Sequence, residues 1–428
     1  MDKIKIGLIG LGTVASGVYK TLQSFENIEI VKIAVRDINK ERNIDGLDKN
    51  ILTLDANEIV NDKDIQIVVE LIGGVEPAMT LIKTALNNGK HVVTANKELL
   101  AKHGEELFDL AQKNNRVILY EGAIAGGIPI IMPVKTILSA NKINKIEAIL
   151  NGTTNYILTK MDVDKSSYDD VLKEAQKLGY AEADPTSDVE GYDAAYKLAT
   201  LATISFNKRI KIEDVYREGI SKVRAEDIDY ANELGYKIKL IAHAEMIDEN
   251  NADVRVHPMF VSKKTSLAHI DFVTNAVTIS GFPIGQVTLS GPGAGEFPTA
   301  SSVAGDIIVL SNEIGTTDYI LPMMRCKHGS VANVIDIKET ENKYYLSVKV
   351  NNKKGIIGKL GIVFAENGIS LASLLQKGVS DDNTATIVII TETCKEKDVL
   401  KAIEELEQEG CISKLNSMIR VAKWCIKV

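Results

Sequence analysis

The residue types best suited to chemistry gather between positions 179 and 197. Five carboxylates and no lysine or arginine occur from Glu182 to Asp193, and Lys197 is then the only charge between Ala194 and Asn207. The acids are Glu182, Asp184, Asp188, Glu190 and Asp193. Helix-breaking residues at 179, 185 and 191 predict an ordered loop for these acids. The apolar spacing that follows predicts a helix with Lys197 on its buried stripe.

Two interpretations fit Lys197. Asp193 and Lys197 can form an ordinary i,i+4 ion pair on a wet helix face, which is worth a few tenths of a kcal/mol. However, the predicted helix has almost no polar face, and an unpaired buried charge is costly. Because buried ionisable pairs concentrate at active sites, we favour a functional Lys197 with Asp193 as its partner.

The N-terminal segment is typical of a dinucleotide-binding unit. A β-rich run over 3–9 opens directly into the turn Gly10-Leu11-Gly12-Thr13-Val14, and a helical pattern follows to about residue 25. Gly10 permits the tight turn, while Gly12 lets backbone N–H groups approach a pyrophosphate at the helix N-terminus. A second strand is predicted over 28–35, so the elements come in the order that this motif requires.

The residues after the second strand bear on the choice of cofactor. Arg36 comes first, Asp37 second, and Lys40 is near. An arginine at this place pairs with the 2′-phosphate of NADP(H), whereas an acid accepts a hydrogen bond from the free 2′-hydroxyl of NAD(H). We therefore expect NADP(H), with NAD(H) as the alternative. The other interpretation of Arg36 is a solvated loop residue.

Alternating units continue along the chain and predict a parallel α/β sheet. Further strands are expected over 65–72, 91–94 and 116–120. Thr94 and Lys97 follow a strand at the edge where open α/β sheets bind ligands, although Lys97 could also be a surface charge at a helix start. Glu121 is followed by a loop of small residues, whose carbonyl oxygens suit a hard cation. Taken alone, that loop is an ordinary turn.

The composition changes after about residue 130. A strand over 143–150 ends in an Asn-Gly-Thr-Thr-Asn turn, and strand periodicity returns over 236–261 and 275–289, which predicts the sheet of an α+β catalytic domain. A glycine-rich stretch over 291–295 leads into a helix over 298–314. The polar residues 323–341 predict a linker that leaves the tail free to shift. The tail alternates as βαββαβ, with its last strand expected over 419–426.

Composition sets further bounds on the protein. A chain of 428 residues with 45% hydrophobic content predicts two or three domains with real cores. The net charge of −8 with mixed signs argues against nucleic-acid and membrane partners, and no apolar run is long enough to span a membrane. The first residues enter a strand directly, so we expect no signal peptide and a cytoplasmic protein. The cysteines form no CxxC pattern, so free thiols are expected at Cys326, Cys394, Cys411 and Cys425.

The stretch from Ala175 to Lys197 resembles the signature of the homoserine dehydrogenase family. The shared pattern is A-x3-G-Y-A-x2-D-P-x2-D-V-x-G-x-D-x3-K, and the resemblance extends over essentially the whole chain. It implies a Rossmann-type domain over 1–135 completed by a helix over 298–316, a catalytic and dimerisation domain over 136–320, and a ferredoxin-like ACT domain over 340–428. It also implies the reversible NAD(P)H-dependent reduction of L-aspartate 4-semialdehyde to L-homoserine, in threonine, methionine and isoleucine biosynthesis.

The resemblance also implies a role for each site residue. The catalytic residues would be Lys197, Asp193 and Lys97. The substrate would contact Gly179, Glu182, Asp188 and Thr153. The cofactor would contact Gly10, Leu11, Gly12, Thr13, Val14, Arg36, Thr94, Lys97 and Gly293. A sodium ion would be held by the side chain of Glu121 and the carbonyls of Ile124, Gly126 and Ile128.

Assembly and regulation follow from the same resemblance. It implies a homodimer or homotetramer, and threonine as the effector of the ACT domain. Because the chain starts at the first strand, we expect no kinase domain before the nucleotide motif. The effector turn appears here as Asn352-Lys353-Lys354-Gly355, without the aspartate and proline usual in ACT domains, and a plain dimerisation module is the alternative. Two other functions stay open. An inactive amino-acid sensor predicts loss of Lys197 or Glu182, which are both present, and a different NADP-dependent semialdehyde reductase would share the architecture.

Overall fold

The computed structural model describes residues 3–314, 324, 326, 328–377 and 383–422. Contacts divide the chain into two compact units, each made from three segments. The first unit contains residues 1–150, 193–215 and 274–332, and the second contains residues 151–192, 216–273 and 333–428. The division into three domains at about 135 and 340 is drawn along the sequence and stays a prediction.

A six-stranded parallel sheet forms one part of the first unit. Its order is β3-β2-β1-β4-β5-β6, which is the order of doubly wound dinucleotide-binding sheets. The strands are β1 (Ile4–Ile9), β2 (Ile28–Ala34), β3 (Leu52–Thr53), β4 (Ile67–Glu70), β5 (His91–Thr94) and β6 (Ile118–Leu119). The side chains of β4 and β5 are all buried, as expected when helices cover both faces of a sheet. The order in which successive strands are added reverses between β1 and β4, and such sheets bind nucleotides at this point.

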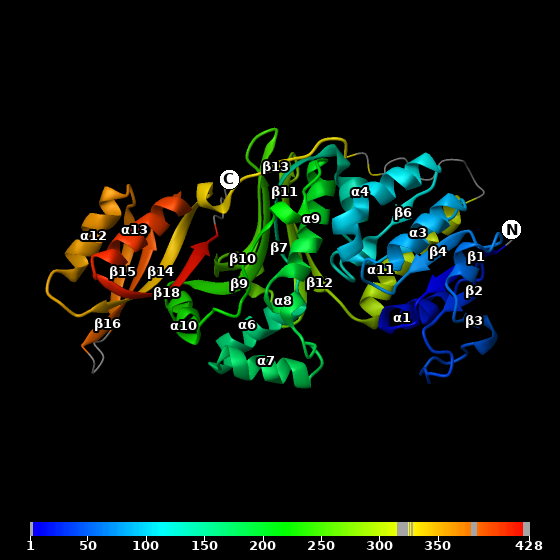
Figure 1. The fold of residues 1–428 in the computed structure, drawn as a ribbon, viewed down its shortest axis with the longest axis horizontal. Coiled ribbons are helices and arrows are strands. Elements are labelled where there is room, and N and C mark those ends of the chain that lie inside the picture. The colour runs from blue at the N-terminus through cyan, green and yellow to red at the C-terminus, as the bar shows by residue number, and fades with distance from the viewer. Residues whose placement is uncertain (1–2, 315–323, 325, 327, 378–382, 423–428) are drawn as a thin grey trace. The chain divides into compact units, whose positions relative to one another are not determined.

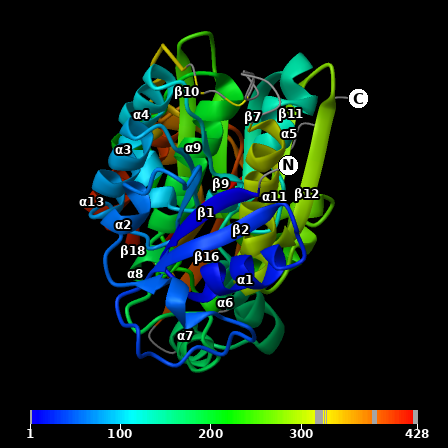
Figure 2. The same ribbon diagram turned by 90° about the vertical axis from the view of Figure 1, so that its right-hand side faces the viewer.

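Helices far apart in the sequence pack together on this sheet. They are α1 (Thr13–Leu22), α2 (Asn57–Val60), α3 (Ala78–Asn87), α4 (Lys97–Lys113) and α11 (Glu296–Glu313). Figure 2 shows α1 and α11 side by side next to β2. A Cβ atom on Gly17 would lie 2.6 Å from the Glu296 carbonyl oxygen, so only glycine allows this close approach. Lys20 and Glu296 add an ion pair of 2.8 Å between the two helices.

Three antiparallel strands and two helices, one of them largely buried, also belong to the first unit. The strands β7 (Lys142–Ile149), β11 (Thr274–Phe282) and β12 (Gly285–Pro292) pair in the order β12-β11-β7. The helices are α5 (Ile131–Lys135) and α9 (Tyr192–Phe206). Most side chains of α9 are buried, and Asp193 and Lys197 are among them. The predicted helix with a buried Lys197 is therefore present.

The second unit is built around one mixed sheet, shown with its helices in Figure 1. Its strands are β9 (Tyr236–Met246), β10 (Asn251–Ser262), β14 (Glu341–Asn351), β15 (Leu371–Lys377), β16 (Thr384–Thr391) and β18 (Ile412–Val421), with short pieces β8 (Tyr216–Arg217), β13 (Asn333–Val334) and β17 (Cys394–Lys395). Its helices are α6 (Gly152–Asp164), α7 (Tyr168–Lys177), α8 (Thr186–Val189), α10 (Ala225–Glu233), α12 (Ile356–Glu366) and α13 (Glu396–Gln408). The predicted βαββαβ order of the tail is confirmed, and α12 and α13 share one apolar core with its sheet.

The tail packs firmly within the second unit. Strand β18 pairs in parallel with β10, where Phe260 stands opposite Val421. The ring of Tyr345 stacks on Phe260 with centroids 4.5 Å apart, and its hydroxyl donates to Asp227 at 2.9 Å. Buried Arg255 on β10 donates to Thr340 and Asn342. These contacts do not support our expectation of a tail that shifts freely on a bare linker, because part of that segment is itself the strand β13, paired with β10.

Element boundaries differ from the prediction at the last strand. β18 begins at Ile412, seven positions before the predicted start, and the predicted residues 423–426 lie outside the described part of the chain. The first half of β18 is polar and half exposed, so it lacks the alternation from which strands are recognised. Cys326, Cys394 and Cys411 are free thiols, and Cys425 lies outside the described residues. Among the described residues, no helix is both long and apolar enough to cross a bilayer.

Candidate active site

One buried carboxylate joins two lysines in the first unit. The Oδ2 atom of Asp193 lies 2.8 Å from Nζ of Lys197, and its Oδ1 atom pairs with Nζ of Lys97. Lys197 also donates to the carbonyl oxygen of Leu150 at 2.8 Å. The three predicted catalytic residues are therefore brought together, with Lys97 reaching the pair from the first turn of α4.

Local structure explains how each of the three side chains is positioned. Asp193 and Lys197 are four residues apart on α9, so they lie on one face of the helix. Asn96 caps α4 by accepting the backbone N–H of Leu99, which fixes Lys97 as the first helical residue. Lys197 is buried, whereas the Lys97 side chain is 42% exposed. The carboxylate therefore bridges an interior ammonium and one that faces solvent.

Two ammonium groups decide the protonation of Asp193. Burial alone raises the pKa of Asp193, but the nearby charges of Lys197 and Lys97 outweigh it and hold this pKa well below its usual range. Asp193 is thus an anion at neutral pH. A fixed anion is suited to keeping two cations oriented.

The glycine turn after β1 opens on a cavity of about 490 Å³. The cavity is lined by residues of the turn, of the ends of β1, β2 and β4, and of the loop after β2. Gly10 has a φ of +99°, and a Cβ atom there would lie 3.1 Å from the Leu71 carbonyl oxygen. A Cβ atom on Gly12 would meet no other atom within 4 Å, so the backbone of Gly12 faces open space. The turn Gly10 to Val14 thus offers N–H groups and the start of α1 to a dinucleotide pyrophosphate.

Cations surround the end of this cavity beyond β2. Arg36, Lys40 and Arg42 all line it. Arg42 donates to the carbonyls of Lys40 and Asp37, so it holds the loop in place. The Asp37 carboxylate accepts the backbone N–H of Asn39 within the loop. Sequence reasoning missed Arg42, because its part in the loop depends on backbone contacts that no motif encodes.

Buried Glu70 organises the edge of the sheet near Thr94. Its Oε1 accepts the N–H groups of Ile72 and Gly73, and its Oε2 accepts the hydroxyl of Thr94 at 2.7 Å. Thr94 therefore donates its hydroxyl proton to Glu70, and a cofactor contact from this residue would use its other atoms. Sequence reasoning missed Glu70, although an acid within the apolar run of residues 65–72 was a usable signal.

The loop after β6 combines a buried carboxylate with small residues. Glu121 accepts the backbone N–H groups of Ile130 at 2.5 Å, Ile131 at 2.8 Å and Met132 at 2.7 Å. The Gly126 carbonyl accepts the hydroxyl of Ser302 at 2.6 Å. Carboxylate and carbonyl oxygens each carry two lone pairs, so Oε2 of Glu121 and the Gly126 oxygen keep acceptor capacity beyond these bonds. This donor set fits a hard cation.

Asp306 is a second acid beside this loop that the sequence did not single out. Its carboxylate accepts the backbone N–H of Glu121 at 2.8 Å. Burial, together with the charge of Glu121, raises the pKa of Asp306 well above its usual range. Asp306 of α11 therefore holds the start of this loop through its bond to the Glu121 N–H.

Gly293 lies in a crowded place where a side chain cannot fit. A Cβ atom there would lie 1.9 Å from the side-chain nitrogen of Asn275, and one on Gly126 would lie 2.3 Å from the Gly293 carbonyl oxygen. The glycine-rich stretch over 291–295 therefore packs directly on the loop after β6. That contact places Gly293 beside Gly126 within the first unit.

The four predicted substrate contacts belong to the second unit. Thr153 donates from its hydroxyl to the Tyr180 carbonyl at 2.7 Å, and Asp188 accepts from the side chain of Asn151 at 2.7 Å. Gly179 has a φ of +77° after α7, and Glu182 is exposed. Within that unit, Thr153 and Asp188 thus join the Asn-Gly-Thr-Thr-Asn turn to the acidic segment.

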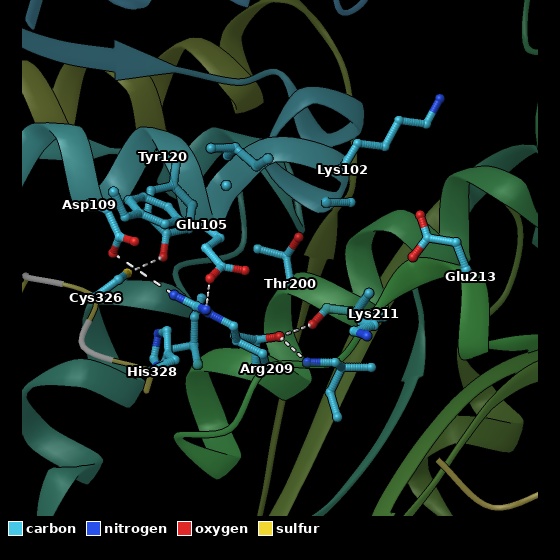
Figure 3. A pocket seen from close by; sticks show the side chains of 18 residues that line it. Lys102, Glu105, Asp109, Tyr120, Thr200, Arg209, Lys211, Glu213, Cys326 and His328 are labelled. Atoms are coloured by element: carbon cyan, nitrogen blue, oxygen red, sulfur yellow. Dashed lines mark hydrogen bonds and ion pairs between the residues drawn. The ribbon is translucent and has the colours of Figure 1, made fainter. Parts of the chain in front are cut away.

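A smaller cavity in the first unit lies on another side of α9. It has a volume of about 130 Å³, and Figure 3 shows its lining. From α9 it is lined by Ala199, Thr200, Thr203 and Ile204, not by Lys197. Arg209 pairs with Glu105 and, at 3.9 Å, with Asp109. The Tyr120 hydroxyl oxygen lies 3.1 Å from Sγ of Cys326. Because its main charges pair with one another, we do not place the chemistry here.

Family models match three successive parts of the chain. The model described as homoserine dehydrogenase, NAD binding domain, matches residues 10–121. The model described as homoserine dehydrogenase matches residues 129–308, and the ACT domain model matches residues 344–411. These matches confirm the expected fold class of a Rossmann-type domain, an α+β catalytic part and a ferredoxin-like ACT domain.

Curated relatives and solved structures agree with these matches. The homoserine dehydrogenase of Synechocystis is 43% identical over 98% of this chain and 99% of its own length. That of Bacillus subtilis is 39% identical over 98% and 99%. The crystal structure of a homoserine dehydrogenase from Thiobacillus denitrificans has a TM-score of 0.93 at 38% identity and covers 99% of both chains. Together with the lysine pair on Asp193 and the glycine turn, these likenesses show that the chain belongs to the homoserine dehydrogenase family of oxidoreductases.

Proposed function

We propose that this chain interconverts L-aspartate 4-semialdehyde and L-homoserine with NAD(P)(H), using Lys197 as its acid and base. The observation that carries the proposal is the buried Lys197, fixed by Asp193 at 2.8 Å and by the Leu150 carbonyl at 2.8 Å. A lysine held in this way is oriented before substrate arrives, which favours catalysis over simple ion pairing.

The nicotinamide, when bound, supplies the hydride that converts the aldehyde carbon to an alcohol carbon. As that carbon gains hydride, its oxygen becomes negative and needs a cation and then a proton. Lys197 stabilises this oxygen and donates the proton, and in the reverse direction Lys197 accepts it from the homoserine hydroxyl. Asp193 orients Lys197, and Lys97 neutralises the second oxygen of the same carboxylate.

The amino-acid end of the substrate needs a partner for its ammonium group. Glu182 is exposed at the start of the acidic segment, and we assign it this role. Gly179, with its positive φ, and Thr153 would approach the substrate backbone, while Asp188 would hold the turn that carries Thr153. The assignments of Gly179, Glu182 and Asp188 follow the resemblance in the signature stretch, and that of Thr153 follows the resemblance in the Asn-Gly-Thr-Thr-Asn turn.

NADP(H) is the proposed cofactor, with NAD(H) as the alternative. Arg36 and Lys40 line the cavity at the end of β2, where we expect the adenosine ribose of a dinucleotide to bind. Arg42 holds their loop through a hydrogen bond to the Lys40 carbonyl. A guanidinium forms a charge-assisted pair with a phosphate, whereas a free ribose hydroxyl carries no charge to pair with it. A solved hyperthermophilic archaeal homoserine dehydrogenase in complex with NADPH is 29% identical to this chain, with a TM-score of 0.63 over 73% of it.

A sodium ion is proposed for the loop after β6. Glu121 and the carbonyls of Ile124, Gly126 and Ile128 would hold it, and it would stiffen the loop against the stretch that contains Gly293. Thermal unfolding in sodium chloride and in tetramethylammonium chloride tests this proposal without turnover. A sodium-specific rise in the unfolding midpoint that disappears in Glu121→Gln supports the site, and equal midpoints in both salts contradict it.

Threonine is the proposed effector of the tail, and the enzyme is proposed to act as a homodimer or homotetramer in threonine, methionine and isoleucine biosynthesis. The stretch Asn352 to Gly358 includes the first residues of α12, whose N-cap is Gly355 with a φ of +87°. Backbone N–H groups at such a helix start favour a carboxylate. Threonine can regulate only if it binds one arrangement of the enzyme better than another.

One assay tests the proposed reaction. Purified protein is given L-homoserine with NADP⁺ or with NAD⁺, and the absorbance of the reduced nicotinamide is followed. Reduction of either cofactor that depends on homoserine supports the proposal. No reduction of either, in protein that still binds the cofactor, would reject it and favour an inactive sensor. Turnover with other hydroxy amino acids but not homoserine would favour the alternative semialdehyde reductase.

A further inference from the structure

A large open cavity in the second unit has no part in the proposed reaction. Its volume is about 770 Å³. One side is formed by β8 and the loop that follows it, together with Glu190 and Tyr192. The other side is formed by the start of α13 and by residues 415–420 of β18. The cavity therefore lies between the tail and the segment that precedes Asp193.

The lining carries cations that no acid neutralises. Among the residues that the structure describes, Arg217, Lys222 and Lys338 have no carboxylate partner. In contrast, the acids Glu218 and Glu396 are both taken by Arg420. Glu190, the remaining acid, accepts the hydroxyl of Ser221 at 2.8 Å. The unmatched charge of the cavity is thus positive, which favours an anionic ligand.

Arg217 is prepared for such a ligand. Its guanidinium carbon lies 3.5 Å from the centre of the Tyr192 ring, so the flat group rests on the aromatic face. Stacking orients a guanidinium while leaving its in-plane N–H groups available for a carboxylate or a phosphate. The backbone beneath is also fixed, because a Cβ atom on Gly219 would lie 2.4 Å from the Val189 carbonyl oxygen.

A buried ion cluster connects the two sides of the cavity. Arg420 on β18 is 3% exposed and binds both oxygens of Glu396, the first residue of α13, at 2.6 Å. It also binds Glu218, which directly follows Arg217, at 2.9 Å. Arg420 thus links the start of α13 to Glu218, and Arg217, the residue before Glu218, stacks on Tyr192. Tyr192 is the residue immediately before Asp193 in the chain.

We propose that this cavity is an effector site for a small carboxylate- or phosphate-bearing molecule. Binding of that molecule would alter the stack of Arg217 on Tyr192 and, through Tyr192, the position of Asp193. The binding half of the proposal depends on the cavity alone. The regulatory half rests on the proposed function, because it needs Asp193 to orient Lys197. The site is separate from the turn Asn352 to Gly358 that we propose for threonine.

Binding is tested on the full-length protein without turnover. Potassium citrate and potassium phosphate serve as the two probes, with potassium chloride at matched ionic strength as the reference for screening. We expect calorimetry and thermal unfolding to show binding of at least one probe. Binding of citrate alone assigns a carboxylate ligand, and binding of phosphate alone assigns a phosphate ligand. If neither probe differs from potassium chloride, the proposal is overturned.

Variants locate the binding in the cavity. The double variant Arg217→Met with Lys222→Met should weaken binding by about tenfold or more, since both charge-assisted contacts are lost. The control Lys414→Met changes the same charge on an exposed residue of β18 outside the lining and should keep wild-type binding. Unchanged affinity in the double variant contradicts the site. Cofactor binding by each variant checks that it has folded.

Kinetics test the regulatory half separately. A probe that binds should change kcat or KM for homoserine in the wild type and in Lys414→Met, and should change neither in the double variant. If the probe binds but leaves both constants unchanged in the wild type, the cavity is a binding site and the link through Tyr192 to Asp193 is rejected.

Discussion

Asp193 and Lys197 lie one helical turn apart on α9, with their charged atoms 2.8 Å from each other in the interior of the first unit. The second oxygen of the same carboxylate pairs with Lys97, which enters from a different helix. An ion pair that only stabilised α9 would need neither Lys97 nor burial. The arrangement therefore fits our proposal that Lys197 is held in place for chemistry.

Asp193→Asn should lower kcat/KM for homoserine by about 10² to 10³, because the amide cannot orient two lysines by charge. It should also destabilise the folded protein by about 3–5 kcal/mol, since it leaves Lys197 buried without its anion. Steady-state kinetics and chemical unfolding measure the two effects. Asp184→Asn is the matched control, because that exposed carboxylate accepts the backbone N–H and the hydroxyl of the nearby Thr186. Wild-type turnover in Asp193→Asn would make the pair structural.

The pH dependence of this pair has a definite sign. The folded-state pKa of Asp193 is held well below its unfolded value, despite burial, by Lys197 and Lys97. Its contribution to stability is therefore complete above the unfolded pKa of about 4 and is lost only as the pH falls through the lower folded value. Unfolding free energies of wild type and Asp193→Asn should differ by a constant amount between neutral pH and about pH 5. A difference that shrinks in that range contradicts this account of the site.

Arg36→Ala should raise KM for NADP(H) by about ten- to a hundredfold and leave KM for NAD(H) nearly unchanged. The 2′-phosphate is the only group that distinguishes the two cofactors, and a charge-assisted hydrogen bond to it is worth about 1.5–3 kcal/mol. Arg42→Ala should have a smaller effect in the same direction, because Arg42 acts by holding the loop. Lys49→Ala, an exposed charge outside the cavity, is the control. Equal effects of Arg36→Ala on both cofactors would show that Arg36 does not contact the phosphate.

His91 should make the first unit sensitive to mild acid. Burial, together with the charge of Arg116, lowers the pKa of His91 from 6.5 to about 4. The unfolded chain therefore binds a proton at a higher pH than the folded chain does. The free energy of unfolding falls as the pH drops from about 6.5 towards 4, and the loss is about 2 kcal/mol at pH 5. The variant His91→Gln should be less stable at neutral pH, but its stability should change less between pH 6.5 and pH 4. The thermal unfolding midpoints of both proteins are measured between pH 7.5 and about pH 5. If the two midpoints fall in parallel with pH, His91 does not cause the acid sensitivity.

The tail should be needed for stability as well as for regulation. Removal of the residues after 340 deletes β18, which pairs with β10, the Tyr345 ring, which stacks on Phe260, and Asn342, which accepts from Arg255. We therefore expect the truncated protein to unfold or aggregate, instead of keeping activity without regulation. Threonine inhibition is better tested on the full chain by kinetics and calorimetry at millimolar threonine. A soluble truncated enzyme with wild-type kcat would contradict the packing argument.

Sequence reasoning succeeded where the signal was local. The turn at Gly10 lies between a strand and a helix, and the pair Asp193 and Lys197 is four residues apart on one helix, so spacing alone predicts both. The pairing of Lys97 with Asp193 depends on how α4 meets α9, and the motifs suggested the site but not this contact. Contacts such as Tyr345 with Asp227 leave no local trace, which is why the tail was expected to be loosely attached.

Lys197 is proposed to perform the chemistry, and homoserine oxidation by Lys197→Ala, measured together with cofactor binding by the same protein, tests this role. We expect kcat to fall by about 10² to 10³ or more, while the dissociation constant for NADP(H) stays within about twofold of wild type. Lys113→Ala, which removes an exposed lysine at the end of α4, should retain wild-type kcat. A Lys197→Ala protein that binds cofactor and keeps a near-normal kcat would show that Lys197 is structural and that the proposed mechanism is wrong.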